Sequence, residues 1–411
     1  MPDGSTDVCI AGGGPAGMMA GYLMARAGLR VTVLEKHADF LRDFRGDTIH
    51  PSTMQVMAGL GLLDAFLALP HQKVPTIAAT IGGETVVLGD FRHLPVAAPY
   101  IAMMPQWDFL NFLADRAVTL PGFRLRMQTE AVGLLRRGDQ VTGVRALGPE
   151  GPVDLPARLT IAADGRTSTL REAAGLCPRD IGAPVDVLWF RLARLPGDTD
   201  QTQGRFDRGR ILVMINRGDY WQCAYVIAKG RFEQVRAKGL EAFRAGLATV
   251  LPFGAARASE IAGWDQVKLL NVQINRLERW WLPGLLCIGD AAHAMSPVGG
   301  VGVNLAVQDA VAAANLLVRP LLAGHLSDGD LAAVQARRMW PTRVTQRVQV
   351  LAQSRILVPA MAVTRPAGLP LALRLLLALP GLSRIPARMV GMGVRPELPD
   401  RDLFGSVAAR P

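Results

Sequence analysis

The sequence has only four cysteines in 411 residues, and no two of them have the C-x-x-C spacing of a metal or disulfide motif. Cys9 and Cys287 fall within predicted core strands, so we expect reduced thiols in a cytoplasmic protein and predict no metal site. The first residues also lack the basic start and the long apolar core of a secretory signal. These absences argue against a disulfide-stabilised secreted protein and a metalloprotein.

Aromatic residues make up only 6% of the chain, and they do not alternate with basic residues as in nucleic-acid-binding segments. The net charge of +10 therefore indicates small anionic ligands, such as a diphosphate cofactor, and no nucleic-acid partner is expected. Half of the residues are hydrophobic. A chain of this length can bury a large core and is expected to form two domains.

No uninterrupted apolar run reaches the ~20 residues that a membrane-spanning helix needs. The most apolar stretch, residues 369–379, is interrupted by a proline and an arginine. We predict that residues 346–411 form helices that cover the rest of the chain or a dimer interface, with a peripheral membrane contact as the alternative. Arg384, Arg388 and Arg395 would suit a membrane surface and solvent equally.

A glycine motif near the N-terminus, Gly12-x-Gly14-x-x-Gly17, follows an apolar strand and opens a predicted helix over residues 16–27. Gly12 permits the tight turn, Gly14 lets phosphates approach the backbone, and Gly17 allows the helix and strand to pack closely. A second strand then ends at Glu35, where a carboxylate can bind ribose hydroxyls. This βαβ pattern predicts an adenosine-dinucleotide site, and the motif alone does not separate FAD from NAD(P).

Two further glycine motifs follow apolar strands. Asp164 and Gly165 come directly after one strand, and Asp290 comes after another. The ends of parallel strands meet at one edge of an open sheet, where ligands bind, so these motifs should lie together. A glycine-rich turn then leads through Asn304 into a helix predicted over residues 305–318. Its N-terminus would stabilise negative charge in the same site.

Together these motifs resemble the FAD-dependent aromatic-compound monooxygenases, the family of p-hydroxybenzoate hydroxylase and the ubiquinone-pathway hydroxylases, over roughly residues 5–320. The resemblance implies an α/β fold: a Rossmann-like FAD-binding domain with an inserted β-sheet substrate domain and a helical C-terminal segment. It implies non-covalent FAD, with NAD(P)H as a transient co-substrate. The residues it places around FAD are Gly12, Gly14, Pro15, Ala16, Gly17, Glu35, Lys36, Arg45, Gln106, Asp164, Gly165, Gly289, Asp290, Pro297, Gly300, Gly302, Val303 and Asn304.

In this family NAD(P)H reduces FAD, dioxygen adds to give a flavin C4a-hydroperoxide, and the terminal oxygen is transferred to the substrate. The resemblance therefore implies hydroxylation of an aromatic or polyketide-like substrate, with O2 as co-substrate and the protein a monomer or homodimer. Arg45, Pro297 and Asn304 would lie beside the flavin ring. His50 and His293 are more typical of hydrogen-bonded structural histidines than of catalytic bases, so no catalytic base is assigned. The substrate, and NADH versus NADPH, stay open.

Strand-rich segments lie between the cofactor motifs, and one of them predicts a hairpin around Gly82. Phe190, Met214, Trp221 and Tyr225 are candidate walls of a substrate pocket, with ordinary core packing as the alternative. The expected domains are an FAD-binding domain of residues 1–75, 105–180 and 276–345, a substrate domain of residues 76–104 and 181–275, and a C-terminal segment of residues 346–411.

Three other functions share this cofactor domain. A flavin-dependent halogenase would carry a WxWxIP signature, which the sequence lacks. A reductase of an isoprenoid or other lipophilic substrate would suit the apolar C-terminal segment and would incorporate no oxygen. A membrane-associated flavoprotein without turnover would bind FAD and oxidise no NAD(P)H. The three intact motifs favour the monooxygenase.

Overall fold

The computed structural model describes residues 6–41, 48–362 and 381–405. A central sheet runs in the order β19-β20-β11-β1-β2-β8, with β9 and β10 extending β11 as an antiparallel ribbon. Four strands, β20, β11, β1 and β2, are joined by parallel pairing, and β8 continues this arrangement. The strands are β1 (Thr6–Ala11), β2 (Val31–Leu34), β8 (Phe123–Arg126), β9 (Glu130–Arg137), β10 (Gln140–Gly148), β11 (Gly151–Ala162), β19 (Trp281–Leu282) and β20 (Leu285–Cys287).

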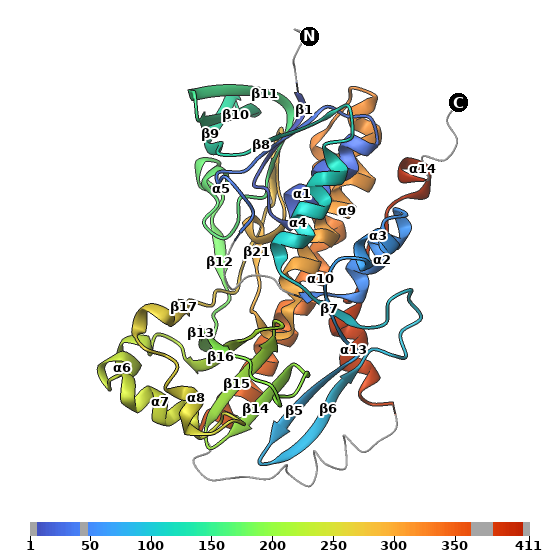
Figure 1. The fold of residues 1–411 in the computed structure, drawn as a ribbon. Helices are drawn as coiled ribbons and strands as arrows, with labels where there is room; N and C mark the ends of the chain where they lie inside the picture. Colours follow the sequence, from blue (N-terminus) through green and yellow to red (C-terminus); the bar gives the residue numbers. More distant parts are fainter. Residues whose placement is uncertain (1–5, 42–47, 363–380, 406–411) are drawn as a thin grey trace.

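Long helices pack beside this sheet, and α1 and α9 contact each other extensively (Figure 1). The inner parts of these strands, residues 8–11 of β1, all of β2, residues 159–162 of β11 and all of β20, are buried under helices and loops, as in other parallel sheets. Among the described residues, one helical stretch, 298–322, is long and apolar enough to cross a membrane, but it is mostly buried in this core. The helices of this part are α1 (Pro15–Arg26), α2 (Pro51–Gly59), α3 (Leu63–Leu67), α4 (Gln106–Ala117), α5 (Thr169–Ala173), α9 (Val301–Leu322) and α10 (Asp328–Ala352).

A second sheet, drawn in the lower half of Figure 1, joins two distant stretches of the chain. Its order is β17-β13-β16-β15-β14-β5-β6, and β5 pairs in parallel with β14. The predicted hairpin is confirmed: β5 and β6 are antiparallel, and Gly82 and Gly83 have positive φ. The elements are β5 (Thr76–Ile81), β6 (Glu84–Asp90), β13 (Val185–Ala193), β14 (Gln203–Asp207), β15 (Arg210–Asn216), β16 (Tyr220–Ala228), β17 (Lys268–Leu270), α6 (Phe232–Ala237), α7 (Leu240–Ala248) and α8 (Ala255–Ala258).

The candidate pocket walls on this sheet prove to be core. Phe190, Met214 and Trp221 are fully buried among side chains of α7 and its neighbours, and the Tyr225 ring lies edge-on to Phe243. Successive side chains of a strand point to opposite faces, so the residues next to these in the sequence lie on the face turned toward the cofactor domain. The core alternative is confirmed, and the pocket-wall alternative is wrong for these four residues.

Two small sheets and the C-terminal helices connect the halves of the molecule. The α10 helix runs without a break across the domain boundary expected at residue 345, and a π-helical turn (Gln353–Leu357) continues it. The apolar stretch 369–379 lies outside the described residues. The remaining elements are β3 (Thr48–Ile49), β4 (Gln72–Val74), β7 (Ile101–Met103), β12 (Pro178–Asp180), β18 (Asn275–Leu277), β21 (His293–Ala294), α11 (Val358–Ala362), α13 (Arg384–Gly391) and α14 (Arg401–Phe404).

Candidate functional site

The three glycine motifs meet at one edge of the central sheet. Strands β1, β11 and β20 are parallel neighbours, and each is followed directly by one motif. A Cβ atom added at Gly289, in the third motif, would lie 3.0 Å from the Cβ of Ala16 in the first. The predicted convergence is therefore confirmed, and it creates a ligand site at the carboxyl end of the parallel strands.

In the first motif the backbone makes the close contacts that require glycine at Gly12 and Gly17. Gly12 has a φ of +105°, and a Cβ there would lie 2.3 Å from the carbonyl oxygen of Ala163. A Cβ at Gly17 would lie 1.9 Å from the carbonyl oxygen of Gly12, so only glycine allows the α1 helix this close to the turn. At Gly14 the same atom would meet no protein atom within 4 Å. The backbone at the N-terminus of α1 is therefore open to a phosphate-sized ligand.

Glu35 lies against this glycine turn. Its Oε2 accepts a hydrogen bond from the Gly13 amide at 3.1 Å, and its Oε1 accepts one from the His37 amide at 3.0 Å. The buried carboxylate is thus fixed beside the open backbone of the motif. Lys36, the next residue, is exposed and lies 3.8 Å from the carboxylate of Glu130.

The second motif is organised by Asp164. Its carboxylate accepts hydrogen bonds from the Ser168 hydroxyl and, at 3.1 Å, from the Leu170 amide. Ser168 in turn accepts from the Arg171 amide at 3.1 Å and caps α5. Gly165 has a φ of +89°, and a side chain there would meet no protein atom. This turn also leaves open space at the sheet edge.

Two arginines join the second and third motifs. The Arg166 side chain donates a 2.9 Å hydrogen bond to the carboxylate of Asp290. Arg171 donates to the carbonyl oxygens of Ala291 at 3.1 Å and of Arg166 at 2.7 Å. Arg171 is only 8% exposed, so it is a buried part of this connection and not a solvated surface charge.

The glycine-rich loop before α9 is held by Asn304. Its side-chain oxygen accepts hydrogen bonds from the His50 amide and the Thr53 hydroxyl, both at 2.8 Å. Its amide nitrogen donates to the carbonyls of Thr48 at 3.1 Å and Gly300 at 3.2 Å. The helix begins at Val301, four residues before the predicted start. The Asn304 side chain therefore fixes the N-terminal turn of α9 against residues 48–53.

A buried ionic cluster lies behind the third motif. Asp309 is fully buried in α9 and accepts from the Gly289 amide at 3.1 Å, from His293 Nε2 at 2.6 Å and from Arg338 Nε at 2.9 Å. Burial alone would raise the pKa of Asp309, but the charges and hydrogen bonds of His293 and Arg338 lower it below its ordinary value. The sequence reasoning missed this cluster. The signal available was an acid within an otherwise apolar helix.

Both histidines that could have been considered catalytic are structural. His293 binds Asp309, and its ring lies 5.0 Å from that of Trp280. His50 is fully buried, and its Nδ1 donates to the carbonyl of Val390 at 2.8 Å. Burial lowers the pKa of His50 to about 4, although this hydrogen bond works in the opposite direction.

Several other residues of the expected site lie at or near the start of a helix. Gln106 is half-buried and is the first residue of α4. Pro297 precedes a short 3-10 turn, and Gly302 and Val303 lie in the first turn of α9. Arg45 lies outside the described residues.

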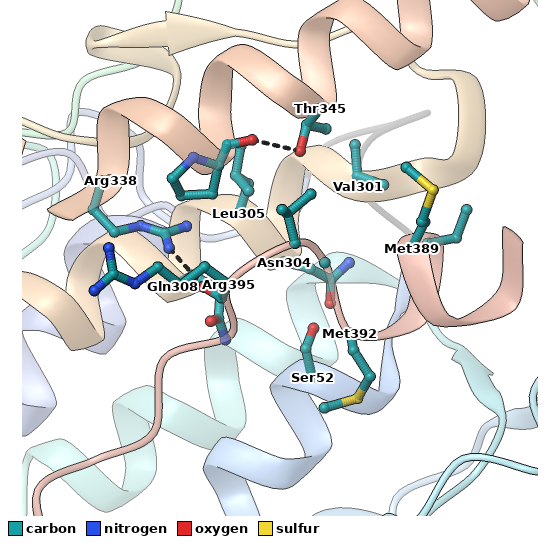
Figure 2. A pocket seen from close by; sticks show the side chains of 14 residues that line it. Ser52, Val301, Asn304, Leu305, Gln308, Arg338, Thr345, Met389, Met392 and Arg395 are labelled. Carbon is teal, nitrogen blue, oxygen red and sulfur yellow. Dashed lines mark hydrogen bonds between the residues drawn. The ribbon is translucent and has the colours of Figure 1, made fainter. Parts of the chain in front are cut away.

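A cavity lies between α9, α10 and the end of α13 with the segment that follows it (Figure 2). Val301, Asn304 and Gln308 line it from α9, and Met389 and Met392 line it from the C-terminal segment. The cavity is mostly apolar, and the residues labelled in Figure 2 come from four parts of the chain: α2, α9, α10 and the segment around the end of α13.

The open backbone of the glycine turns, a helix N-terminus at the sheet edge and a carboxylate beside it are features that fit an adenosine dinucleotide. Gly14, Gly165 and Gly302 each face space where a side chain would meet no protein atom. The α9 N-terminus adds a second positive helix end to the same region. The residues present therefore fit FAD, which spans two such subsites.

Comparison with known proteins defines the class. The profile of the FAD binding domain family matches residues 5–348. The 6-methylpretetramide 4-monooxygenase of Streptomyces rimosus is 32% identical over 355 residues, which cover 86% of this chain and 84% of that protein. The 3-demethoxyubiquinol 3-hydroxylase of Escherichia coli (strain K12) is 26% identical and covers 82% of this chain and 87% of that protein.

Among solved structures, OxyS, an anhydrotetracycline hydroxylase from Streptomyces rimosus, superimposes with a TM-score of 0.74. The two chains are 25% identical, and the match covers 94% of this chain and 76% of that chain. The fold and the site thus define an FAD-dependent monooxygenase. The chain belongs to the FAD binding domain family.

Proposed function

We propose that this enzyme uses NAD(P)H and O2 to hydroxylate a polycyclic aromatic substrate of the polyketide type. The observation that carries the proposal is the convergence of three strand ends and the α9 N-terminus on one open backbone surface, in a chain whose relatives are named for such reactions. Bound FAD would supply the oxygen-transfer chemistry, through the flavin C4a-hydroperoxide. The protein would supply binding, orientation and exclusion of water.

Each part of the sheet edge has a role in this proposal. The N-terminus of α1, with Gly12 and Gly14, would bind the pyrophosphate, and Glu35 would bind the ribose. Asp290 would bind the ribityl chain, and its ion pair with Arg166 would set its position. The backbone amides at Val303 and beyond would stabilise negative charge on the pyrimidine end of the flavin ring.

The substrate pocket would lie on the face of the second sheet that is turned away from α7. Trp189 and Val213 stand on that face and, unlike Phe190, Met214 and Trp221, are only partly buried; they lie beside a cluster that includes Met103 of β7 and Val390 of α13. Met103 pairs with Thr48, and the Thr48 hydroxyl donates to the Gly300 carbonyl in the loop that Asn304 holds. A broad apolar wall of this kind would suit a flat, multi-ring substrate better than a small charged benzoate.

The four cysteines are unpaired, and three of them are buried. Burial raises the pKa of the Cys9 thiol to about 12, so it stays protonated and unreactive at neutral pH. These thiols support our inference that the enzyme works in the reducing cytoplasm.

The test is NAD(P)H oxidation by the FAD-loaded protein against anthraquinones, tetracycline-type polyketides, quinone precursors and hydroxybenzoates, with mass analysis of each product. The proposal expects a multi-ring phenol to accelerate NAD(P)H oxidation and to gain one oxygen atom. A product that gains two hydrogen atoms and no oxygen would replace it with the reductase alternative. Acceleration by small hydroxybenzoates alone would contradict the proposed substrate class.

A further inference from the structure

One stretch of the chain carries the whole net charge. Residues 331–396 contain ten arginines and no lysine, aspartate or glutamate. The other 35 basic residues of the chain are balanced by its 35 acidic residues, and the total is +10. An acid-free stretch of this length cannot neutralise itself, so those of its arginines that are exposed create a local positive potential that attracts anionic partners.

The described part of this stretch places its arginines beside exposed apolar side chains. On α10, Trp340, Arg343, Arg347 and Leu351 follow one another at intervals of three or four residues and therefore form a row on one helix face. Trp340 and Leu351 are 54% and 56% exposed. Both arginines are exposed and have no ion-pair partner among the described residues.

The row continues beyond α10. Arg355 and Ile356 lie in the π-helical turn that follows, and Ile356 is 60% exposed. On α13, Arg388 and Ile385 are exposed in the same way, and Ile385 is 58% exposed. Met389 of α13 lines the same cavity as Pro341 and Thr345 of α10, so the two helices are neighbours; Figure 2 shows Thr345 and Met389 at this cavity.

Single exposed apolar residues are common on soluble proteins and need no explanation. This surface differs because large apolar side chains and arginines alternate on it and the stretch 331–396 that forms it contributes no acid. Tryptophan and arginine are side chains that place an apolar body in the interfacial layer of a bilayer and a polar group among the headgroups. The side chains protrude from the outer face of helices, a shape that suits a flat partner better than a peptide.

We propose that the outer surface of α10, its π-helical turn and α13 docks on a lipid bilayer with anionic headgroups. The contact is peripheral, because among the described residues the one stretch that could span a membrane, 298–322, is buried in the core. Arginines bind the headgroup phosphates, and Trp340, Leu351, Ile356 and Ile385 enter the interfacial layer. This inference goes beyond the proposed hydroxylation and does not depend on it.

The test is co-sedimentation of the full-length, FAD-loaded protein with vesicles of phosphatidylcholine alone and with vesicles that contain phosphatidylglycerol. We expect binding to the anionic vesicles that weakens as salt is added, and little binding to phosphatidylcholine. Equal binding to both, or binding to neither, would overturn the proposal. In the second case an acidic protein surface becomes the better partner.

Two charge variants distinguish the contribution of this surface to vesicle binding from the contribution of the protein's net charge. Replacing Arg343, Arg347 and Arg355 by glutamine should weaken binding to anionic vesicles by roughly 100-fold, since each arginine near such a surface contributes a few-fold to tenfold. The matched control replaces three exposed arginines elsewhere, Arg124, Arg137 and Arg236, and removes the same charge.

The control should retain most of the affinity. Equal losses in the two variants would show that only net charge matters, and the assigned surface would be wrong. A third variant, Trp340→Ser with Leu351→Ser, should weaken binding with little change in its salt dependence. Unchanged FAD content and melting temperature establish that each variant is folded.

Discussion

Replacing Asp309 by asparagine tests whether the buried cluster behind the third motif fixes the flavin loop. The carboxylate accepts from three donors on three elements, the Gly289 amide, His293 and Arg338, at 2.6 to 3.1 Å. Asparagine keeps one acceptor oxygen and turns an NH2 group toward at least one of these donors. It also removes the negative charge that compensates the buried Arg338 side chain, which is 1% exposed.

Breaking a buried ion pair from one side costs about 3 to 5 kcal/mol. At an unfolding entropy of about 2.1 cal/mol/K per residue, a chain of this length changes its melting temperature by roughly 1 °C per kcal/mol. The variant should therefore melt about 4 to 6 °C below the parent protein, and it should bind FAD more weakly because the cluster that holds the Gly289 turn loses one of its three hydrogen bonds or its charge balance. Thermal unfolding and flavin titration measure the two effects.

The matched control is Asp139→Asn, on an exposed turn that carries the same change of charge. It should leave both quantities unchanged. A melting temperature of Asp309→Asn within about 1 °C of the parent would refute the reasoning, because Arg338 would then find sufficient compensation elsewhere. A lower melting temperature with unchanged FAD affinity would show that the cluster stabilises the fold without positioning the loop.

Gly14→Val should keep the parent's melting temperature in the absence of FAD, because the added side chain meets no protein atom. It should fail to bind FAD, because the side chain fills the phosphate site. Calorimetry and flavin titration check the two effects, and retained FAD binding would contradict the assigned phosphate site. Gly300→Ala should lose at least about 1 kcal/mol of unfolding free energy in urea titrations and should weaken FAD binding, since φ is +62° and the Cβ would lie 2.2 Å from Thr48 Oγ1. The control, Gly329→Ala in the first turn of α10, should be nearly neutral in the same titrations. Burial lowers the pKa of His50 from 6.5 to about 4, so between these pH values His50 is protonated in the unfolded chain and neutral in the folded protein. The protein should therefore lose roughly 3 kcal/mol of unfolding free energy as the pH falls through that window. His50→Gln should lose less over the same range in urea unfolding, and an unchanged pH dependence would show that His50 is protonated in the folded state.

The βαβ unit and the convergence of the three motifs could be predicted because each depends on local rules. Glycines that need positive φ or close contact, such as Gly12 and Gly17, leave a fixed spacing in the sequence. Parallel strands also bring their carboxyl ends to one edge whatever their order. The hairpin at Gly82 follows equally from its two glycines.

The faces of the second sheet could not be predicted from the sequence. Trp189 and Phe190 are adjacent apolar residues on opposite faces of β13, and only the packing of α7 against one face tells them apart. The early start of α9 was hidden because Val301 and Gly302 are weak helix formers, and hydrogen bonds from distant Thr48 and Thr53 stabilise that turn. Long-range contacts of this kind have no local signature.

The most direct test of the central claim is a single turnover with labelled dioxygen. The FAD-loaded protein is reduced, freed of excess NAD(P)H, and mixed with 18O2 and a multi-ring phenol that stimulates NAD(P)H oxidation. An FAD-dependent monooxygenase should place one labelled oxygen atom in the product per bound FAD, with the second atom in water. Oxygen in the product that comes from solvent, or a reduced product without label, would contradict the account.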